Sequence, residues 1–159
     1  MNERIETAVL RGFSVSLCRA AGLSADDAAL LADSILFAEC RGVTSHGLLR
    51  LPQYIARLRS GATASNVPMP FTMESGGTAR LDAQNGLGQL AGRKASDKAE
   101  ELAAEYGVSF VAVANSNHFG TGAWYAIPAA RRGFFAFNIS SAASAMAPHG
   151  AAQPLLGTD

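Results

Sequence analysis

The chain has 159 residues, of which 48% are hydrophobic and 16% charged, and its thirteen basic side chains balance thirteen acidic ones. This length suits one ordinary domain, or a small domain plus part of another, with enough apolar residues for a core. A net charge of zero without a basic patch argues against nucleic acid or an acidic membrane as a partner, and no apolar run approaches the ~20 residues needed to cross a bilayer.

The first forty residues have apolar side chains at helical spacing. This pattern predicts one helix over 3–21 and a second over 24–42. Ser24 is expected to cap the second helix, because Asp26 and Asp27 follow it and acidic groups in a first turn complement the helix dipole.

Residues 45–60 form a third helical segment, which opens with the most informative motif of the chain, Ser-His-Gly-Leu-Leu-Arg. In a helix, His46, Arg50 and Tyr54 lie on one face, because residues four apart are neighbours. An imidazole that titrates near neutral pH, beside a guanidinium that binds carboxylates with two hydrogen bonds, suits a small anionic substrate. Pro52 is unfavourable inside a helix, so we expect a helical turn followed by a separate helix that begins just before it.

Residues 61–77 are rich in glycine, proline and small polar residues, which predicts a loop or short linker. We place a boundary there, between a helical N-terminal region (1–75) and an α/β region (76–159). The loop-like residues 140–159 supply no closing element, so the α/β region is expected to be incomplete. Strands and helices alternate in it, which implies a layered α/β domain. The predicted elements are a strand at 78–82, a turn at 85–86, a helix at 87–106 closed by Gly107, a buried strand at 108–114, a loop at 115–122, a helix at 123–132 and a strand at 134–139.

The loop at 115–122 is a candidate ligand site. It follows a predicted strand and precedes a predicted helix, where α/β proteins bind ligands. Its glycines allow close approach to the backbone, and its amides and His118 can orient a polar ligand. The alternative is a structural loop whose side chains satisfy neighbouring backbone groups. The same two interpretations apply to His149.

Two further motifs resemble those of known enzyme sites but are better explained by other roles. Gly86, Gly88 and Ala91 match the G-x-G-x-x-A fingerprint of Rossmann enzymes, but no acidic residue ends the next predicted strand. A turn with close helix packing is therefore favoured, with a Rossmann site as the alternative. Ser45 adjoins His46 without the G-x-S-x-G context of a hydrolase, so we interpret Ser45 as a helix N-cap or a proton-relay partner.

The sequence does not favour a metal site. His46, His118 and His149 lie far apart, without carboxylates at ligand-like spacing. Cys18 and Cys40 match no metal spacing and are interpreted as small buried thiols of a protein in a reducing compartment. The N-terminus carries acidic residues and lacks the apolar core of a secretory signal, so a cytoplasmic location is expected.

Taken together, these motifs resemble the malate/L-lactate dehydrogenase family, which is distinct from the Rossmann enzymes. The family includes ureidoglycolate dehydrogenase, sulfolactate dehydrogenase, diketogulonate reductase and the piperideine/pyrroline-2-carboxylate reductases. The matching segments are 41–52, 85–88, 115–120, 146–148 and 154–158. The resemblance implies a helical N-terminal region followed by a three-layer α/β domain with a mixed sheet. It also implies an oxidoreductase that transfers hydride between NAD or NADP and a 2-hydroxy or 2-oxo acid, such as malate or lactate, or a cyclic imino acid.

The resemblance also implies residue roles. His46 would donate the proton to the substrate carbonyl or imine, with Ser45 as its relay partner, although in some members the histidine matching His118 takes the proton instead. Substrate would be bound by Arg50, by Tyr54 on the same face, and by Thr158. The cofactor would be lined by His118, Phe119, Gly120, Thr121 and Gly122. Family members are generally dimers, so a homodimer is expected.

The chain departs from the family pattern in two ways. Thr44 and Asp159 stand where the family commonly has aspartate and asparagine. The family also continues well beyond residue 158, so the chain resembles only the front half of such an enzyme. The alternative function is therefore a truncated, catalytically inactive homologue that binds a ligand or forms dimers.

Overall fold

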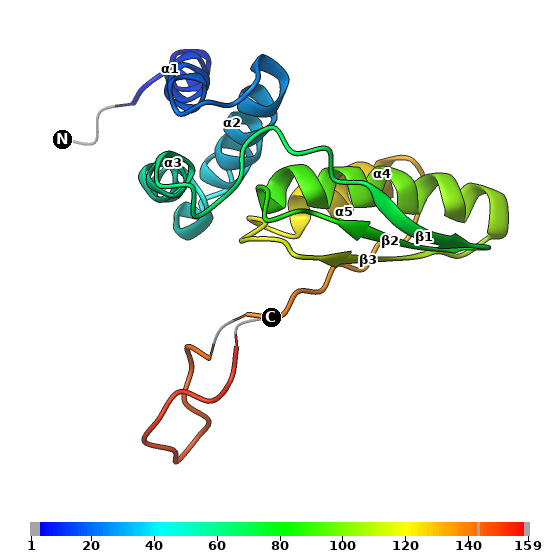
Figure 1. Cartoon of the computed structure of the whole chain (residues 1–159). Coiled ribbons are helices and arrows are strands. Elements are labelled where there is room, and N and C mark those ends of the chain that lie inside the picture. The colour runs from blue at the N-terminus through cyan, green and yellow to red at the C-terminus, as the bar shows by residue number, and fades with distance from the viewer. Residues whose placement is uncertain (1–3, 143, 158–159) are drawn as a thin grey trace.

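In a computed structural model of the chain, the structure describes residues 4–142 and 144–157 (Figure 1). These residues form five α-helices, two short 3-10 helices and one three-stranded sheet. Within this part of the chain, no helix has the length and apolar character needed to span a membrane.

The N-terminal region consists of three packed helices, α1 (Thr7–Ala20), α2 (Ala25–Glu39) and α3 (Leu51–Arg59). The predicted cap of α2 is confirmed, because the hydroxyl of Ser24 accepts a hydrogen bond from the backbone N–H of Asp27 at 3.1 Å. Burial of one Leu or Ile side chain contributes about 1.5–3 kcal/mol, and such side chains hold the three helices together. The shared core includes Cys18, Leu31, Ile35, Tyr54 and Leu58.

Two single-turn 3-10 helices, η1 (Thr44–His46) and η2 (Leu48–Arg50), lead into α3. The expected helical turn followed by a separate helix is thus confirmed, with Pro52 in the first turn of α3. Gly47 separates the two turns. Glycine is needed at this position because a side chain there would collide with Glu39. The carboxylate of Glu39 instead accepts the backbone N–H of Leu48 at 2.8 Å.

The sheet has the order β1-β2-β3 and is mixed. Its strands are β1 (Phe71–Ser75), β2 (Thr78–Asp82) and β3 (Phe110–Ala114), with β1 antiparallel and β3 parallel to β2. Helix α4 (Gly88–Tyr106) joins the two parallel strands and ends at Gly107, which has the expected left-handed conformation. Figure 1 shows α4 lying across one face of the sheet, with α5 (Ala123–Arg131) beside it. The α/β class, the helical N-terminal region and the mixed sheet are confirmed.

Several local predictions are wrong. Residues 71–75 of the expected loop form β1, because Gly76 and Gly77 make a two-residue hairpin turn rather than a linker. Gly77 also lies against the backbone of Val108, where a side chain would collide with the carbonyl oxygen. The boundary proposed between 1–75 and 76–159 stays a prediction, although the pairing of β1 with β2 crosses it.

The remaining corrections concern burial. The segment 134–139 forms no strand and exposes Phe135, Phe137 and Ile139, with Phe135 at 95%. The strand expected to be buried at 108–114 begins at Phe110, which is itself exposed. Cys18 is buried as expected, but Cys40 is exposed.

Candidate active site

The side chain of Asn117 joins the loop after β3 to the 85–86 turn and to the helical region. Nδ2 of Asn117 donates hydrogen bonds of 2.9 and 3.0 Å to the backbone and side-chain oxygens of Asn85, and one of 3.0 Å to the carbonyl of Gly86. Its Oδ1 accepts from Nη2 of Arg57, in α3, at 2.8 Å. These contacts bring the loop at 115–122 against α3, so the two sequence motifs meet in space.

His118 is oriented by two donors. The phenolic oxygen of Tyr54, which is buried, lies 2.8 Å from Nδ1 of His118. The backbone N–H of Gly120 also points at Nδ1, from 3.3 Å. Because a backbone N–H can only donate, Nδ1 is an acceptor and the Tyr54 hydroxyl donates to it. The proton of the neutral imidazole is therefore on Nε2, where it is available to a ligand.

The two candidate catalytic histidines form a stacked pair. The rings of His46 and His118 have centroids 5.3 Å apart and planes inclined by 28°. Ser45, which the sequence suggested as an N-cap or a relay partner, lies inside η1 and caps no helix; its hydroxyl lies 2.9 Å from Nδ1 of His46. The N-cap interpretation is therefore wrong, and the contact with His46 is the one that a relay requires.

The pKa of each imidazole is lowered from the ordinary value of histidine. Partial burial, and then the positive charge of Arg50, lower the pKa of His46. The same two causes lower the pKa of His118, and the neighbouring His46 lowers it further. Both rings therefore favour the neutral form at pH 7, and protonating one makes protonating the other less favourable.

Arg50 is held in place by neutral acceptors. Its Nε donates to the carbonyl of Ser45 at 2.8 Å, and its Nη1 donates to Oε1 of Gln53 at 3.0 Å. Arg50 borders a cavity of about 220 Å³, which we call the α3 cavity. His46 does not line this cavity but stacks on His118, which does. The lining residues are Arg50, Gln53, Tyr54, Arg57, Thr63, Leu87, Asn117 and His118.

The loop residues predicted to line a cofactor pack mainly inward. The ring of Phe119 stacks on Tyr125 at 5.4 Å between centroids, and its carbonyl accepts from the Tyr125 hydroxyl. Gly120 is buried, with a positive φ of 81°. Gly122 precedes α5, and Thr121 is half-buried. A nicotinamide cofactor therefore fits this loop only in part, through His118 and Thr121 rather than through Gly120.

The Rossmann-like fingerprint is used for packing. Strands β2 and β3 and helix α4 do form a parallel βαβ unit. A side chain at Gly86 would, however, collide with Met69 and Val67, and one at Gly88 would collide with carbonyl oxygens of the 117–118 segment. The chain itself thus fills the space that a pyrophosphate would need, which supports the interpretation of a turn with close helix packing.

The sequence did not single out Gln53 or Arg57, although both line the α3 cavity. Its spacing in the sequence could have indicated Arg57, since Arg57 lies two helical turns after Arg50 and therefore on the same side of the helix. Of the other candidates, His149 lies exposed in the C-terminal segment. Thr158 lies outside the described residues.

Comparison with known proteins identifies the family. The model of the malate/L-lactate dehydrogenase family matches residues 5–159. Malate dehydrogenase of Pyrococcus abyssi is 35% identical over 156 residues, which are 98% of this chain and 43% of that protein. L-sulfolactate dehydrogenase of Methanocaldococcus jannaschii is 38% identical over 138 residues, 87% of this chain and 40% of its own length.

A solved structure agrees with this match. Malate dehydrogenase from Pyrococcus horikoshii OT3 superposes with a TM-score of 0.80 and 33% identity, over 82% of this chain and 38% of that one. The chain spans less than half the length of each of these three relatives. With the matching fold and the family match over nearly all its residues, the chain belongs to the malate/L-lactate dehydrogenase family.

Proposed function

We propose that this chain forms the substrate side of an NAD(P)-dependent oxidoreductase that interconverts a 2-hydroxy acid and a 2-oxo acid. The observation that carries the proposal is that Arg50, Tyr54 and His118 line one cavity, with the ring of His46 stacked on His118. It unites two groups that transfer protons near neutral pH with a fixed cation. The relatives that bear the names malate dehydrogenase and L-sulfolactate dehydrogenase support this assignment.

Arg50 binds the substrate carboxylate in this proposal. Its guanidinium is already oriented by Ser45 and Gln53, so little side-chain freedom is lost when an acid binds. A bidentate pair with a carboxylate would fix both the position and the orientation of the carbon that reacts.

His46 exchanges the proton with the substrate oxygen, and His118 is the competing candidate. The lowered pKa keeps His46 neutral at pH 7, so it accepts the hydroxyl proton when a 2-hydroxy acid is oxidised. Ser45, in contact with Nδ1, serves as the relay. Proton transfer of this kind contributes on the order of 10²–10⁴-fold in rate, and the nicotinamide, when bound, supplies or accepts the hydride.

The cofactor would lie against His118, Phe119, Gly120, Thr121 and Gly122. The inward packing of Phe119 and Gly120 makes His118 and Thr121 the contacts to expect within this loop. The proposal includes both NAD and NADP as the possible cofactor. Among curated relatives, a sulfolactate dehydrogenase of Chromohalobacter salexigens carries NADP⁺ in its name.

A second candidate is a catalytically inactive homologue that binds a ligand or forms dimers in the cytoplasm. It is favoured by the exposed apolar side chains of Phe135, Phe137 and Ile139, which are 95%, 78% and 70% accessible. Oxidation of NADH and NADPH with pyruvate, oxaloacetate and a cyclic imine separates the two functions. Turnover with any of these acids supports the oxidoreductase. Self-association without turnover supports the second candidate.

A further inference from the structure

We propose that Gln89 is a positioning residue for His118. Its buried amide holds the Tyr54 hydroxyl in either of two directions, so that Nδ1 of the imidazole is able both to accept and to donate a hydrogen bond. The inference rests on the proposed function, because it explains how the ring of His118 takes up a proton at the site. Gln89 does not line the α3 cavity, and it acts through Tyr54.

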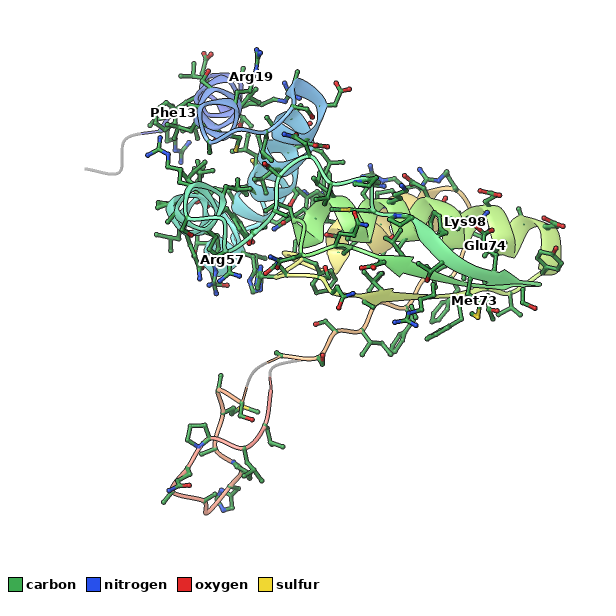
Figure 2. The ribbon with its side chains drawn as sticks, viewed as in Figure 1. Phe13, Arg19, Arg57, Met73, Glu74 and Lys98 are labelled. Carbon is green, nitrogen blue, oxygen red and sulfur yellow. The ribbon has the colours of Figure 1, made fainter. Side chains whose placement is uncertain are left out.

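The first turn of α4 places Gln89 against the loop that carries His118. The preceding residue, Gly88, approaches this loop so closely that a side chain there would collide with the carbonyl oxygen of His118. Further along the same helix, Lys98 pairs instead with Glu74 of β1, at a distance of 2.9 Å (Figure 2). The beginning of α4 thus packs against the candidate site, and its later part packs on the sheet.

The amide of Gln89 lies next to both donors that face Nδ1 of His118. Nε2 of Gln89 is 3.6 Å from the point that a Cβ of Gly120 would occupy, and the backbone N–H of Gly120 is directed at Nδ1. The amide also reaches the Tyr54 hydroxyl. Burial raises the pKa of this phenol, and the nearby Gln89 amide, followed by the charge of Arg50, opposes the rise. One buried side chain therefore adjoins the two groups that orient the ring.

No other contact fixes the orientation of this amide. Gln89 is fully buried, and neither its Oε1 nor its Nε2 makes a hydrogen bond within residues 4–142 and 144–157. A buried amide without partners is costly, so its presence calls for an explanation. Because nothing determines which of its two ends faces Tyr54, the amide is free to turn over and to present either a donor or an acceptor.

The neutral and protonated forms of His118 need opposite directions of the Tyr54 hydroxyl. In the structure the ring accepts at Nδ1, and the hydroxyl donates to it at 2.8 Å. When the ring takes up a proton, both nitrogens carry hydrogen, and Nδ1 must donate to the phenolic oxygen instead. The hydroxyl hydrogen then needs a buried acceptor, and Oε1 of Gln89 supplies it once the amide has turned. Without that acceptor, protonation would leave a buried hydroxyl unpaired.

The titratable and charged groups around His118 do not favour its protonated form. Burial lowers its pKa most, followed by the charge of Arg50 in η2 and by His46 in η1. Arg57 of α3 adds a second cation to the lining of the α3 cavity, and none of the described residues in that lining carries a carboxylate. Tyr125 of α5 donates its hydroxyl to a loop carbonyl. A neutral acceptor behind the ring is therefore the support that remains for the protonated form.

The test is the titration of the His118 ring, followed by NMR in the full chain without substrate or cofactor. In Gln89→Met an apolar side chain of similar size replaces the amide, so the protonated form alone loses a partner. The acid dissociation constant of His118 should therefore rise about tenfold. Gln89→Leu is a second apolar replacement and should act in the same direction. In a Tyr54→Phe background, Gln89→Met should change this constant by less than about twofold, because the hydroxyl that the amide serves is gone.

Ser14→Ala is the matched control. Ser14 of α1 is also fully buried, and its hydroxyl has no hydrogen-bond partner among the described residues. This variant removes an unpaired polar group outside the site, so it should leave the acid dissociation constant of His118 unchanged. Urea unfolding at pH 8, where His118 is neutral, should show Gln89→Met to be at least as stable as the wild type, whereas a merely structural amide would make the variant less stable.

Three results overturn the inference: an unchanged constant in Gln89→Met, an equal change in the Tyr54→Phe background, or loss of folding in both apolar variants. Each of them leaves the proposed function intact, because the titration involves no turnover. A wild type that transfers no hydride contradicts the proposed function instead, and the titration still decides whether Gln89 supports the protonated ring.

Discussion

The phenolic oxygen of Tyr54 lies 2.8 Å from Nδ1 of His118, and this contact joins α3 to a loop 64 residues further along the chain. Tyr54 is buried in the helical core, so it is a rigid support for a more exposed ring. Because Tyr54 donates to Nδ1, it favours the neutral form of His118 and fixes the tautomer with the proton on Nε2. One hydrogen bond therefore sets both the position and the protonation of a candidate catalytic group.

Removing the Tyr54 hydroxyl should change the titration of His118. In Tyr54→Phe the neutral imidazole loses a donor, so the pKa of His118 should rise towards its ordinary value of 6.5. The free energy of unfolding should fall by about 1 kcal/mol. Titration of the ring protons by NMR measures the pKa. Tyr106→Phe, at an exposed tyrosine, is the control, and an unchanged pKa in Tyr54→Phe would contradict the assigned direction of the hydrogen bond.

Acid should weaken the fold through the same histidines. Their folded-state pKa values lie below 6.5, so the unfolded chain binds more protons as the pH falls below 6.5. The stabilisation is complete above pH 6.5 and is lost as the pH falls through the lowered values. Urea unfolding at pH 7 and pH 5 measures this change. His118→Gln should show a smaller difference between the two pH values, and an identical difference would rule out His118 as a source.

Arg50→Lys should raise the KM for the acid substrate at least tenfold and change kcat less. Lysine keeps the charge but cannot form two parallel hydrogen bonds with a carboxylate. It also cannot reproduce the two contacts to Ser45 and Gln53 that orient the guanidinium. Steady-state kinetics measure the effect, with Arg59→Lys as the control. A normal KM in Arg50→Lys would remove Arg50 from the substrate site.

Two glycine substitutions should change stability in opposite directions. In Gly88→Ala, the new methyl group meets the carbonyl oxygens of Asn117 and His118, which should lower the free energy of unfolding by about 1–3 kcal/mol. In Gly12→Ala, the methyl group meets no atom within 4 Å in α1, so the variant should gain about 0.5–1 kcal/mol from helix propensity. Urea unfolding compares the two. Equal stability of Gly88→Ala and wild type would show that the loop is not packed on α4.

The sequence predicted those parts of the structure that local chemistry determines. Ser24 with Asp27, and Gly107 after α4, are signals complete within a few residues, and both are confirmed. The hairpin at Gly76–Gly77 was missed because a two-glycine turn and a flexible linker have the same composition. Residues 134–139 form a short apolar run rich in phenylalanine, which is typical of a strand, but no described strand pairs with them. Pairing depends on distant residues, which a local pattern does not contain.

In the candidate site, too, the sequence revealed what short local motifs contain and missed what depends on distant residues. His46 and Arg50 were found because they share one short motif, and His118 because it follows a predicted strand. Their assembly depends on Asn117, whose side chain joins the loop to the 85–86 turn and to α3. Arg57 was missed because an arginine on an exposed helix face is ordinary. The cavity and the hydrogen bonds to Thr63 and Asn117 distinguish it from Arg59.

The most direct test of the central claim is the transfer of deuterium from NADH or NADPH, labelled at the transferable position, to the carbonyl carbon of oxaloacetate or pyruvate. Mass spectrometry of the hydroxy acid product detects even slow turnover. We expect the wild-type chain to give product with one deuterium, and His46→Ala to give on the order of 10²–10⁴-fold less while its affinity for the cofactor is unchanged. Equal labelling by His46→Ala, or unlabelled acid from the wild type, would contradict the claim that this cluster performs hydride-transfer chemistry.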